Sequence, residues 1–248
     1  MASGERFFTL SSPAFRAAMI AAAVLISPMS ILPAFSAPAN KPMSTTDRVR
    51  EFLDRGSDFE RAELYVDAIK AYESALEFGG RISASPIVYQ KIAFCYERLG
   101  QLKKALRYYN EAGGRGAVQQ EFYLGRGGVL ERLNEWKLAQ KDYARAVKLS
   151  PYNGESRGRL GRAKLRRGFA ESGLKDLMAA DQLLPDQGWI LYEIAIALYR
   201  LDRIDESAGY LRRSMASGYT PPEPEWAAVI LSASAPTGRF SSYSERNP

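Results

Sequence analysis

The 248-residue sequence contains no histidine and only one cysteine, Cys95. Without histidine there can be no Ser–His–Asp triad, no Cys–His pair and no histidine-bearing zinc site, and the usual general base near neutral pH is missing. A lone cysteine can form neither an intramolecular disulfide nor a thiolate metal cluster. Carboxylate and lysine chemistry remain, but the acidic residues form no distinctive constellation. We therefore expect a protein that is not an enzyme and that holds no metal or cofactor.

The sequence also lacks a continuous apolar run long enough to cross a membrane as a helix. Its longest run near the N-terminus, residues 17–26, falls short of the ~20 residues that a spanning helix needs. Arg6 and Arg16 precede this run and small residues follow it at 34–39, which is the three-part pattern of a secretory signal peptide. We predict that residues 1–39 are cleaved and that the mature chain is periplasmic or secreted. An uncleaved anchor is the alternative.

Residues of similar kind recur along the chain at steps of 34 positions. Small residues form one series, Ala105, Ala139, Gly173 and Ser207, and large apolar residues form a second, Tyr109, Tyr143, Leu177 and Leu211. Predicted turn positions form a third series, Gly100, Asn134, Gly168 and Asp202. The clearest unit covers residues 120–153, with one helix before Asn134 and another that stops before Pro151. A 34-residue helix–turn–helix period indicates stacked repeats that pack on their neighbours.

With this period the chain resembles the tetratricopeptide-repeat family, in an exported bacterial form, over residues 47–231. The resemblance implies an all-α fold, a right-handed superhelical solenoid of about five helix–turn–helix repeats with a C-terminal capping helix. The predicted segments are a linker at 40–46, repeats at about 49–85, 86–119, 120–153, 154–187 and 188–219, a capping helix at 221–231 and a disordered tail at 232–248.

Three local features carry further expectations. Ser85 and Pro86 should start a helix, because serine caps well and proline is tolerated at the first helical position. Gly173 replaces the usual alanine of the repeat and should cost up to ~1 kcal/mol within its helix. Residues 220–223 form a capping box that should begin the last helix, whose Trp226 would cover the end of the stack.

The resemblance further implies that the first helix of each repeat lines a concave groove that binds peptides or partner proteins. Carried onto this sequence, the groove positions of repeats two and three include Ile87, Gln90, Phe94, Glu97, Glu121, Leu124 and Gly128. The candidate partner-binding residues are Arg98, Glu131, Arg132, Arg159, Arg162, Arg166, Trp189, Tyr192, Ile196, Tyr199 and Arg200.

One arginine recurs at the same place in each repeat. The column consists of Arg61, Arg98, Arg132, Arg166 and Arg200. Stacked guanidinium groups would suit carboxylates or phosphates, and Arg159 and Arg162 add charge in repeat four. The structural alternative is that a basic residue just before a turn stabilises the C-terminus of a helix.

An aromatic and aliphatic stripe lies in repeat five. Trp189, Tyr192, Ile196 and Tyr199 have the spacing of one helix face. The stripe could be an apolar anchor for a partner, because binding hot spots favour Trp and Tyr. It could equally pack against the C-terminal helix, and the sequence leaves both possibilities open.

The net charge of +6 would suit an acidic partner, and no nucleic-acid-binding module is recognisable. We predict a non-enzymatic protein–protein interaction scaffold of the cell envelope, not an integral membrane protein once the signal peptide is removed. The alternative is a binder of anionic polysaccharide or lipid headgroups through the arginines of repeat four. The resemblance also implies polysaccharide export and phage adsorption as contexts. The lysine–asparagine clamp with which some family members grip a terminal carboxylate is absent from the groove positions.

Overall fold

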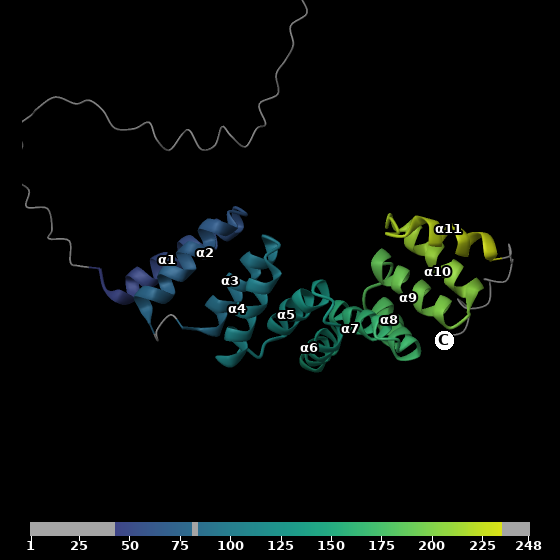
Figure 1. Ribbon diagram of the computed structural model, residues 1–248, viewed down its shortest axis with the longest axis horizontal. Helices are drawn as coiled ribbons and strands as arrows, with labels where there is room; N and C mark the ends of the chain where they lie inside the picture. The colour runs from purple at the N-terminus through teal and green to yellow at the C-terminus, as the bar shows by residue number, and fades with distance from the viewer. Residues whose placement is uncertain (1–42, 81–83, 235–248) are drawn as a thin grey trace, which may run out of the picture. The chain divides into compact units, whose positions relative to one another are not determined.

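The computed structural model describes residues 43–80 and 84–234, and these residues form eleven α-helices and no strand (Figure 1). The helices are α1 (Thr45–Arg61), α2 (Tyr65–Gly79), α3 (Pro86–Arg98), α4 (Leu102–Gly114), α5 (Gln120–Arg132), α6 (Trp136–Leu149), α7 (Gly154–Arg166), α8 (Ala170–Leu183), α9 (Gly188–Arg200), α10 (Ile204–Ala216) and α11 (Pro224–Ala233). Consecutive helices pack as the pairs α1–α2, α3–α4, α5–α6, α7–α8 and α9–α10, and each pair contacts the next. The all-α repeat architecture predicted from the 34-residue period is confirmed.

The turn inside each pair has a left-handed residue where the sequence period places it. Gly100, Asn134, Gly168 and Asp202 have φ values of 71°, 60°, 88° and 60°. Glycine adopts this conformation without steric cost, and Asn and Asp tolerate it better than other residues. At Gly100 and Gly168 an added Cβ would meet no atom within 4 Å, so backbone conformation is what favours glycine there.

Small residues allow the paired helices to approach closely. Ala105, Ala139 and Ser207 are fully buried, and the Ser207 hydroxyl donates a 2.8 Å hydrogen bond to the carbonyl of Ala195 on the facing helix. At Gly173 on α8 we expected only the cost of placing glycine within a helix, but the structure shows a reason for glycine there. A Cβ at this position would lie 2.8 Å from the carbonyl oxygen of Gly161 on α7, so glycine is required by the contact between the two backbones.

The last helix begins later than predicted. It starts at Pro224 with Glu223 as its N-cap, no side chain caps it, and it continues to Ala233. A residue that precedes proline is disfavoured in the α conformation, and the prolines at 221, 222 and 224 therefore delay the helix until Pro224. The predicted capping box at 220–223 does not form.

The N-terminal boundary is close to the expected one. The first helix begins at Thr45, and the hydroxyl of Ser44 accepts a 3.1 Å hydrogen bond from the backbone N–H of Asp47. The predicted signal peptide at 1–39 lies outside the described residues, as does the predicted tail of 232–248 from residue 235 on. The tail prediction was wrong at Ser232 and Ala233, which belong to the last helix. Among the helices that are described, none combines the length and the apolarity needed to cross a membrane.

Candidate functional site

Three first helices, α3, α5 and α7, line one open cavity of about 580 Å³, which we call the groove. It is lined by Ile87, Gln90, Lys91, Phe94 and Glu97 from α3, Glu121, Leu124, Gly125 and Gly128 from α5, Glu155 and Arg159 from α7, with Glu60, Tyr109 and Gln119 at its margins. The groove positions that the sequence assigned to the first helices of repeats two and three therefore face a common space. Of the candidate partner-binding residues, Arg159 alone is part of this lining.

The groove is hollow because α5 presents glycine to it at two positions. A Cβ at Gly125 would overlap the hydroxyl of Tyr109, which reaches the groove through that gap. A Cβ at Gly128 would meet only the Oε1 atom of Glu97, at 3.9 Å, so space lies open above this glycine. The backbone of α5 thus forms part of the floor, and Glu97 faces the open space from the neighbouring helix.

Apolar side chains are exposed at the α3 wall of the groove. Ile87 is 53% exposed and Phe94 is 37% exposed. The ring of Phe94 is held on one side by an edge-to-face contact with Tyr65, with 6.3 Å between ring centroids. Large apolar side chains left in water inside a concavity are a common mark of a binding surface.

The charged groups of the groove fall into paired and poorly paired sets. Lys91 pairs with Glu60 at 3.0 Å, and Arg159 pairs with Glu155 at 2.9 Å. Glu97 forms an ion pair within the described residues only with the half-exposed Arg132, at 3.8 Å, and it also accepts a hydrogen bond from Tyr109. Burial raises the pKa of Glu97, against the opposing effect of the nearby arginines.

Repeats four and five differ, because their inner face is filled by an ion-pair cluster. Arg162 pairs with Glu131 of repeat three at 3.0 Å and with Glu193 of repeat five at 2.9 Å. Arg166 pairs with the same Glu193 oxygen at 3.1 Å. Burial raises the pKa of the Glu193 carboxyl, while Arg162 and Arg166 act in the opposite direction. The cluster therefore neutralises arginines that the sequence offered as partner-binding groups.

Trp189 closes the space beside this cluster. Its ring packs over Gly158 so closely that a Cβ there would lie 2.6 Å from the ring. The guanidinium of Arg162 stacks over the same ring at 4.6 Å from its centroid, a cation–π arrangement.

The arginine column is largely used within the fold. Arg132 donates a 3.3 Å hydrogen bond to the carbonyl of Glu97, and Arg200 donates a 2.6 Å hydrogen bond to the carbonyl of Leu165. Each acceptor lies at the C-terminal end of the first helix of the preceding repeat, where carbonyls lack intrahelical partners. Arg98 instead lies over the ring of Tyr65. The contacts of Arg132 and Arg200 support the structural alternative, in which the column stabilises helix ends, with the refinement that these two guanidinium groups cap a helix of the preceding repeat.

The aromatic stripe of repeat five packs largely against the C-terminal helix. Tyr192 is only 2% exposed and lies edge-to-face against Trp226, with 5.8 Å between centroids. Tyr199 contacts the same indole at 5.6 Å and keeps 43% of its surface exposed. Ile196 is partly buried between the same elements. Tyr192 therefore does not line an open surface, and of these three residues Tyr199 is the most exposed.

Sequence reasoning missed a recurring glutamate–tyrosine contact and the role of Glu193. Tyr72 donates a 2.7 Å hydrogen bond to Glu60, and Tyr143 donates a 2.6 Å hydrogen bond to Glu131, twelve residues earlier in each case. The spacing of twelve residues between glutamate and tyrosine could therefore have indicated this contact. No sequence pattern indicates the role of Glu193, because its partners come from another repeat.

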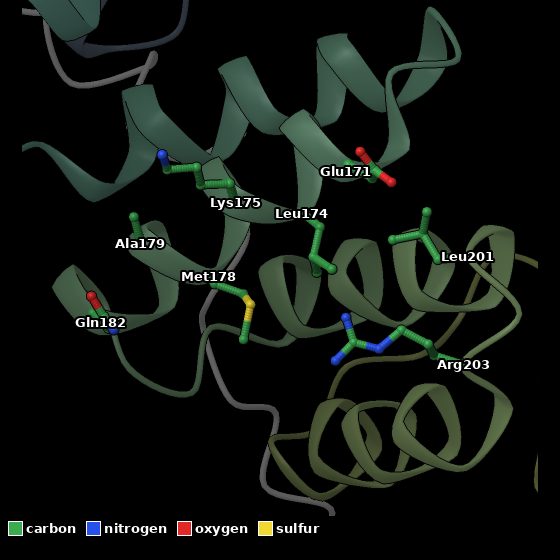
Figure 2. A pocket seen from close by; sticks show the side chains of 8 residues that line it. All are labelled: Glu171, Leu174, Lys175, Met178, Ala179, Gln182, Leu201 and Arg203. Atoms are coloured by element: carbon green, nitrogen blue, oxygen red, sulfur yellow. The ribbon is translucent and has the colours of Figure 1, made fainter. Parts of the chain in front are cut away.

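A second hollow, of about 660 Å³, lies away from the groove beside α8 (Figure 2). Leu174 and Met178 come from α8, and Leu201 and Arg203 come from the turn between α9 and α10. Its charges are mixed, and Arg203 is engaged in two 2.6 Å hydrogen bonds to Glu206. Fewer repeats contribute to this hollow than to the groove, and we therefore regard the groove as the better candidate site.

The described residues offer little for catalysis. Within them, no group of three His, Cys, Asp or Glu side chains is arranged to hold a metal ion. Cys95 is fully buried, and burial raises the pKa of its thiol to about 12, so the reactive thiolate is scarce at neutral pH.

No protein-family model matches the chain. Over 81 residues it is 36% identical to the mitochondrial import receptor subunit TOM70 of Saccharomyces cerevisiae, a match that covers 32% of this chain and spans only 12% of that protein. Among solved structures it is similar to YrrB, described as a TPR protein with an unusual peptide-binding site, with 18% identity and a TM-score of 0.64 over 77% of this chain and 98% of YrrB. It is also similar to MamA of Desulfovibrio magneticus, with 15% identity and a TM-score of 0.65 over 71% of this chain and 97% of that one. The described part of the chain therefore has the fold of a tetratricopeptide-repeat protein.

Proposed function

We propose that the protein is a non-enzymatic interaction scaffold that binds an extended segment of a partner protein in the groove of α3, α5 and α7. The observation that carries this proposal is the single cavity shared by the first helices of three successive repeats. Exposed Ile87 and Phe94 give the groove apolar surface, and Gly128 leaves its floor accessible. The similarity in fold to YrrB, a protein described as having a peptide-binding site, supports a peptide as the ligand.

The ion pairs of repeat four do not favour the alternative of an anionic polysaccharide or lipid ligand. Arg162 and Arg166 both contact Glu193, and Arg159 contacts Glu155. An anionic ligand would have to compete with these carboxylates for the same guanidinium groups. The groove has no such barrier, because its apolar wall and glycine floor already face solvent.

Gly128 allows a direct test of the site. Gly128→Trp would fill the groove from its floor, whereas Gly128→Ala adds a single methyl group into open space. The tagged full chain and both variants are crosslinked gently in the native host, captured and analysed by mass spectrometry. We expect the same partner with the natural chain and the alanine variant, and its loss with the tryptophan variant. A partner retained by Gly128→Trp at the natural level would contradict the groove as the binding site.

We also propose that the scaffold works in the cell envelope, within an envelope assembly or export system. Support comes from the basic, apolar and small-residue pattern of residues 1–39, which has the organisation of a secretory signal. The test is to fractionate the host that expresses the C-terminally tagged chain and to sequence the N-terminus of the purified protein. A mature N-terminus near residue 40 in the periplasmic or secreted fraction is expected. An intact Met1 in the cytosolic fraction would contradict the location.

A further inference from the structure

The groove carries the opposite charge to the chain as a whole. Its lining contains the four glutamates Glu60, Glu97, Glu121 and Glu155 against one lysine and one arginine, a formal charge of −2. The complete chain has a net charge of +6. A ligand responds to the charges that line its own site. The groove would therefore attract a basic ligand, and not the acidic partner that the net charge of the chain suggested.

Two of these carboxylates are available to a ligand. Glu60 and Glu155 are committed to Lys91 and Arg159, at 3.0 and 2.9 Å. Glu121 is exposed and makes no hydrogen bond or ion pair within the described residues. The remaining carboxylate, Glu97, faces the open space above Gly128. It accepts a hydrogen bond from Tyr109, and its one ion pair is a loose one, at 3.8 Å, with the half-exposed Arg132.

Apolar surface lies one helical turn from Glu97. Phe94 and Glu97 are three residues apart on α3, so their side chains share a face with roughly 5–6 Å between Cβ atoms. In an extended peptide, side chains two residues apart also share a face, with roughly 6.6 Å between them. The spacing of an apolar and an acidic site on α3 thus matches alternate residues of an extended ligand.

We infer that the groove selects an extended peptide segment in which an apolar residue and a lysine or arginine occupy alternate positions. The apolar side chain packs on Phe94 and Ile87, and the cation enters the space above Gly128 to meet Glu97. A second cation at the other end of the segment is attracted by Glu121. This inference rests on the proposed function, because it concerns the chemistry of the partner that the groove binds.

Burial of Glu97 supports the assignment. Desolvation raises the pKa of this carboxyl, and the nearby Arg132, Arg159 and Arg98, with the hydrogen bond from Tyr109, offset the effect only in part. A ligand cation placed within hydrogen-bond distance of Glu97 would supply the missing compensation. Lys91 and Arg159, the other cations of the groove, have closer carboxylate partners in Glu60 and Glu155, at 3.0 and 2.9 Å.

The test is selection from a library of displayed random peptides about ten residues long. In extended form, at ~3.3 Å per residue, such peptides can cross three helices that pack ~9 Å apart. The full chain is the bait. Groove-dependent peptides are those that bind the natural chain and Gly128→Ala but fail to bind Gly128→Trp. The best of them is then titrated against Glu97→Gln/Glu121→Gln and against a control, Glu77→Gln/Glu225→Gln, which removes two exposed carboxylates outside the groove.

We expect groove-dependent peptides to be rich in lysine and arginine at alternate positions to apolar residues. The double groove variant should bind the best peptide about tenfold more weakly, and added salt should weaken binding to the natural chain. The control variant should change affinity by no more than about twofold. Acidic or uncharged groove-dependent peptides, or an unchanged affinity in the double groove variant, would overturn this inference and leave the proposed function standing. Recovery of no groove-dependent peptide would overturn the proposed function as well.

Discussion

The inner face of repeats two and three is open as far as Arg159 at the start of repeat four, whereas from Arg162 onward the same face of repeats four and five is filled. Phe94, Gly128, Arg162 and Ile196 occupy equivalent positions in the four repeats. At the first two, an exposed ring and an empty space face the groove; at the third, Arg162 joins Glu131 to Glu193. The same backbone architecture thus supports a binding surface in one half and, in the other, an internal ion-pair cluster that braces neighbouring repeats. The size and charge of single side chains decide whether a repeat is open or filled.

The largest expected effect comes from breaking the brace. In Glu193→Ala the cations of Arg162 and Arg166 lose a carboxylate whose side chain is only 3% exposed. Removing one partner of a buried ion pair leaves uncompensated charge, and we expect a loss of about 3 kcal/mol in the free energy of unfolding. Urea unfolding followed by circular dichroism provides the measurement.

Glu206→Ala is the matched control for that variant. It removes a carboxylate from a pair with Arg203 that is nearly half exposed, and should cost no more than about 1 kcal/mol. Equal losses in the two variants would mean that the cluster in repeats four and five does not brace the fold.

Next in size is the effect of a methyl group in the filled half. In Gly158→Ala the new Cβ would lie 2.6 Å from the ring of Trp189, which must move and disturb its stacking with Arg162. We expect a loss of about 1–2 kcal/mol in unfolding free energy. A change in tryptophan fluorescence of the folded protein should accompany it. Unchanged stability and fluorescence would show that this face is not closely packed.

The same substitution in the open half should have the opposite sign. Gly128→Ala adds a Cβ whose nearest neighbour is 3.9 Å away, and alanine favours a helix over glycine. We expect a gain of up to about 1 kcal/mol in unfolding free energy, measured by urea unfolding. A loss of stability would indicate that the floor of the groove is not open.

The smallest effect concerns pH. Burial raises the pKa of Glu97 in the folded state above its unfolded value, near 4.5. As pH rises past that value, the folded chain therefore keeps the proton on Glu97 to a higher pH than the unfolded chain does. The contribution of Glu97 to stability is therefore present at low pH and is lost as pH rises through the folded pKa. Glu97→Gln should reduce this decline, seen as a smaller difference in unfolding free energy between pH 4.5 and neutrality. A steeper decline in the variant would contradict the direction of the shift.

Much of the fold was predictable because its determinants are local. Positive φ at Gly100 and Asn134 and the burial of Ala105 and Ala139 follow directly from the 34-residue period. The start of the last helix was mispredicted from a capping pattern. The prolines next to it keep the residues before them out of the α conformation, so the helix begins only at Pro224.

The open and filled halves could not be distinguished from sequence. The family pattern identifies which positions face inward, and Phe94 and Glu121 were found in this way. It does not reveal that Trp189 lies over Gly158, or that Glu193 collects two arginines from another repeat, because both depend on contacts more than 25 residues apart in the chain. The sequence therefore suggested that the arginines of repeat four were free to bind a partner, although carboxylates neutralise them. It gave no sign that glutamates dominate the lining of the groove.

Photocrosslinking at two equivalent positions shows whether the partner binds the open half or the filled half. Benzoylphenylalanine would be placed at Phe94 in the open half and at Ile196 in the filled half, each in the full chain within its native host. We expect a specific crosslinked partner from position 94, abolished by Gly128→Trp, and none from position 196. A partner crosslinked from position 196 and not from position 94 would contradict this expectation.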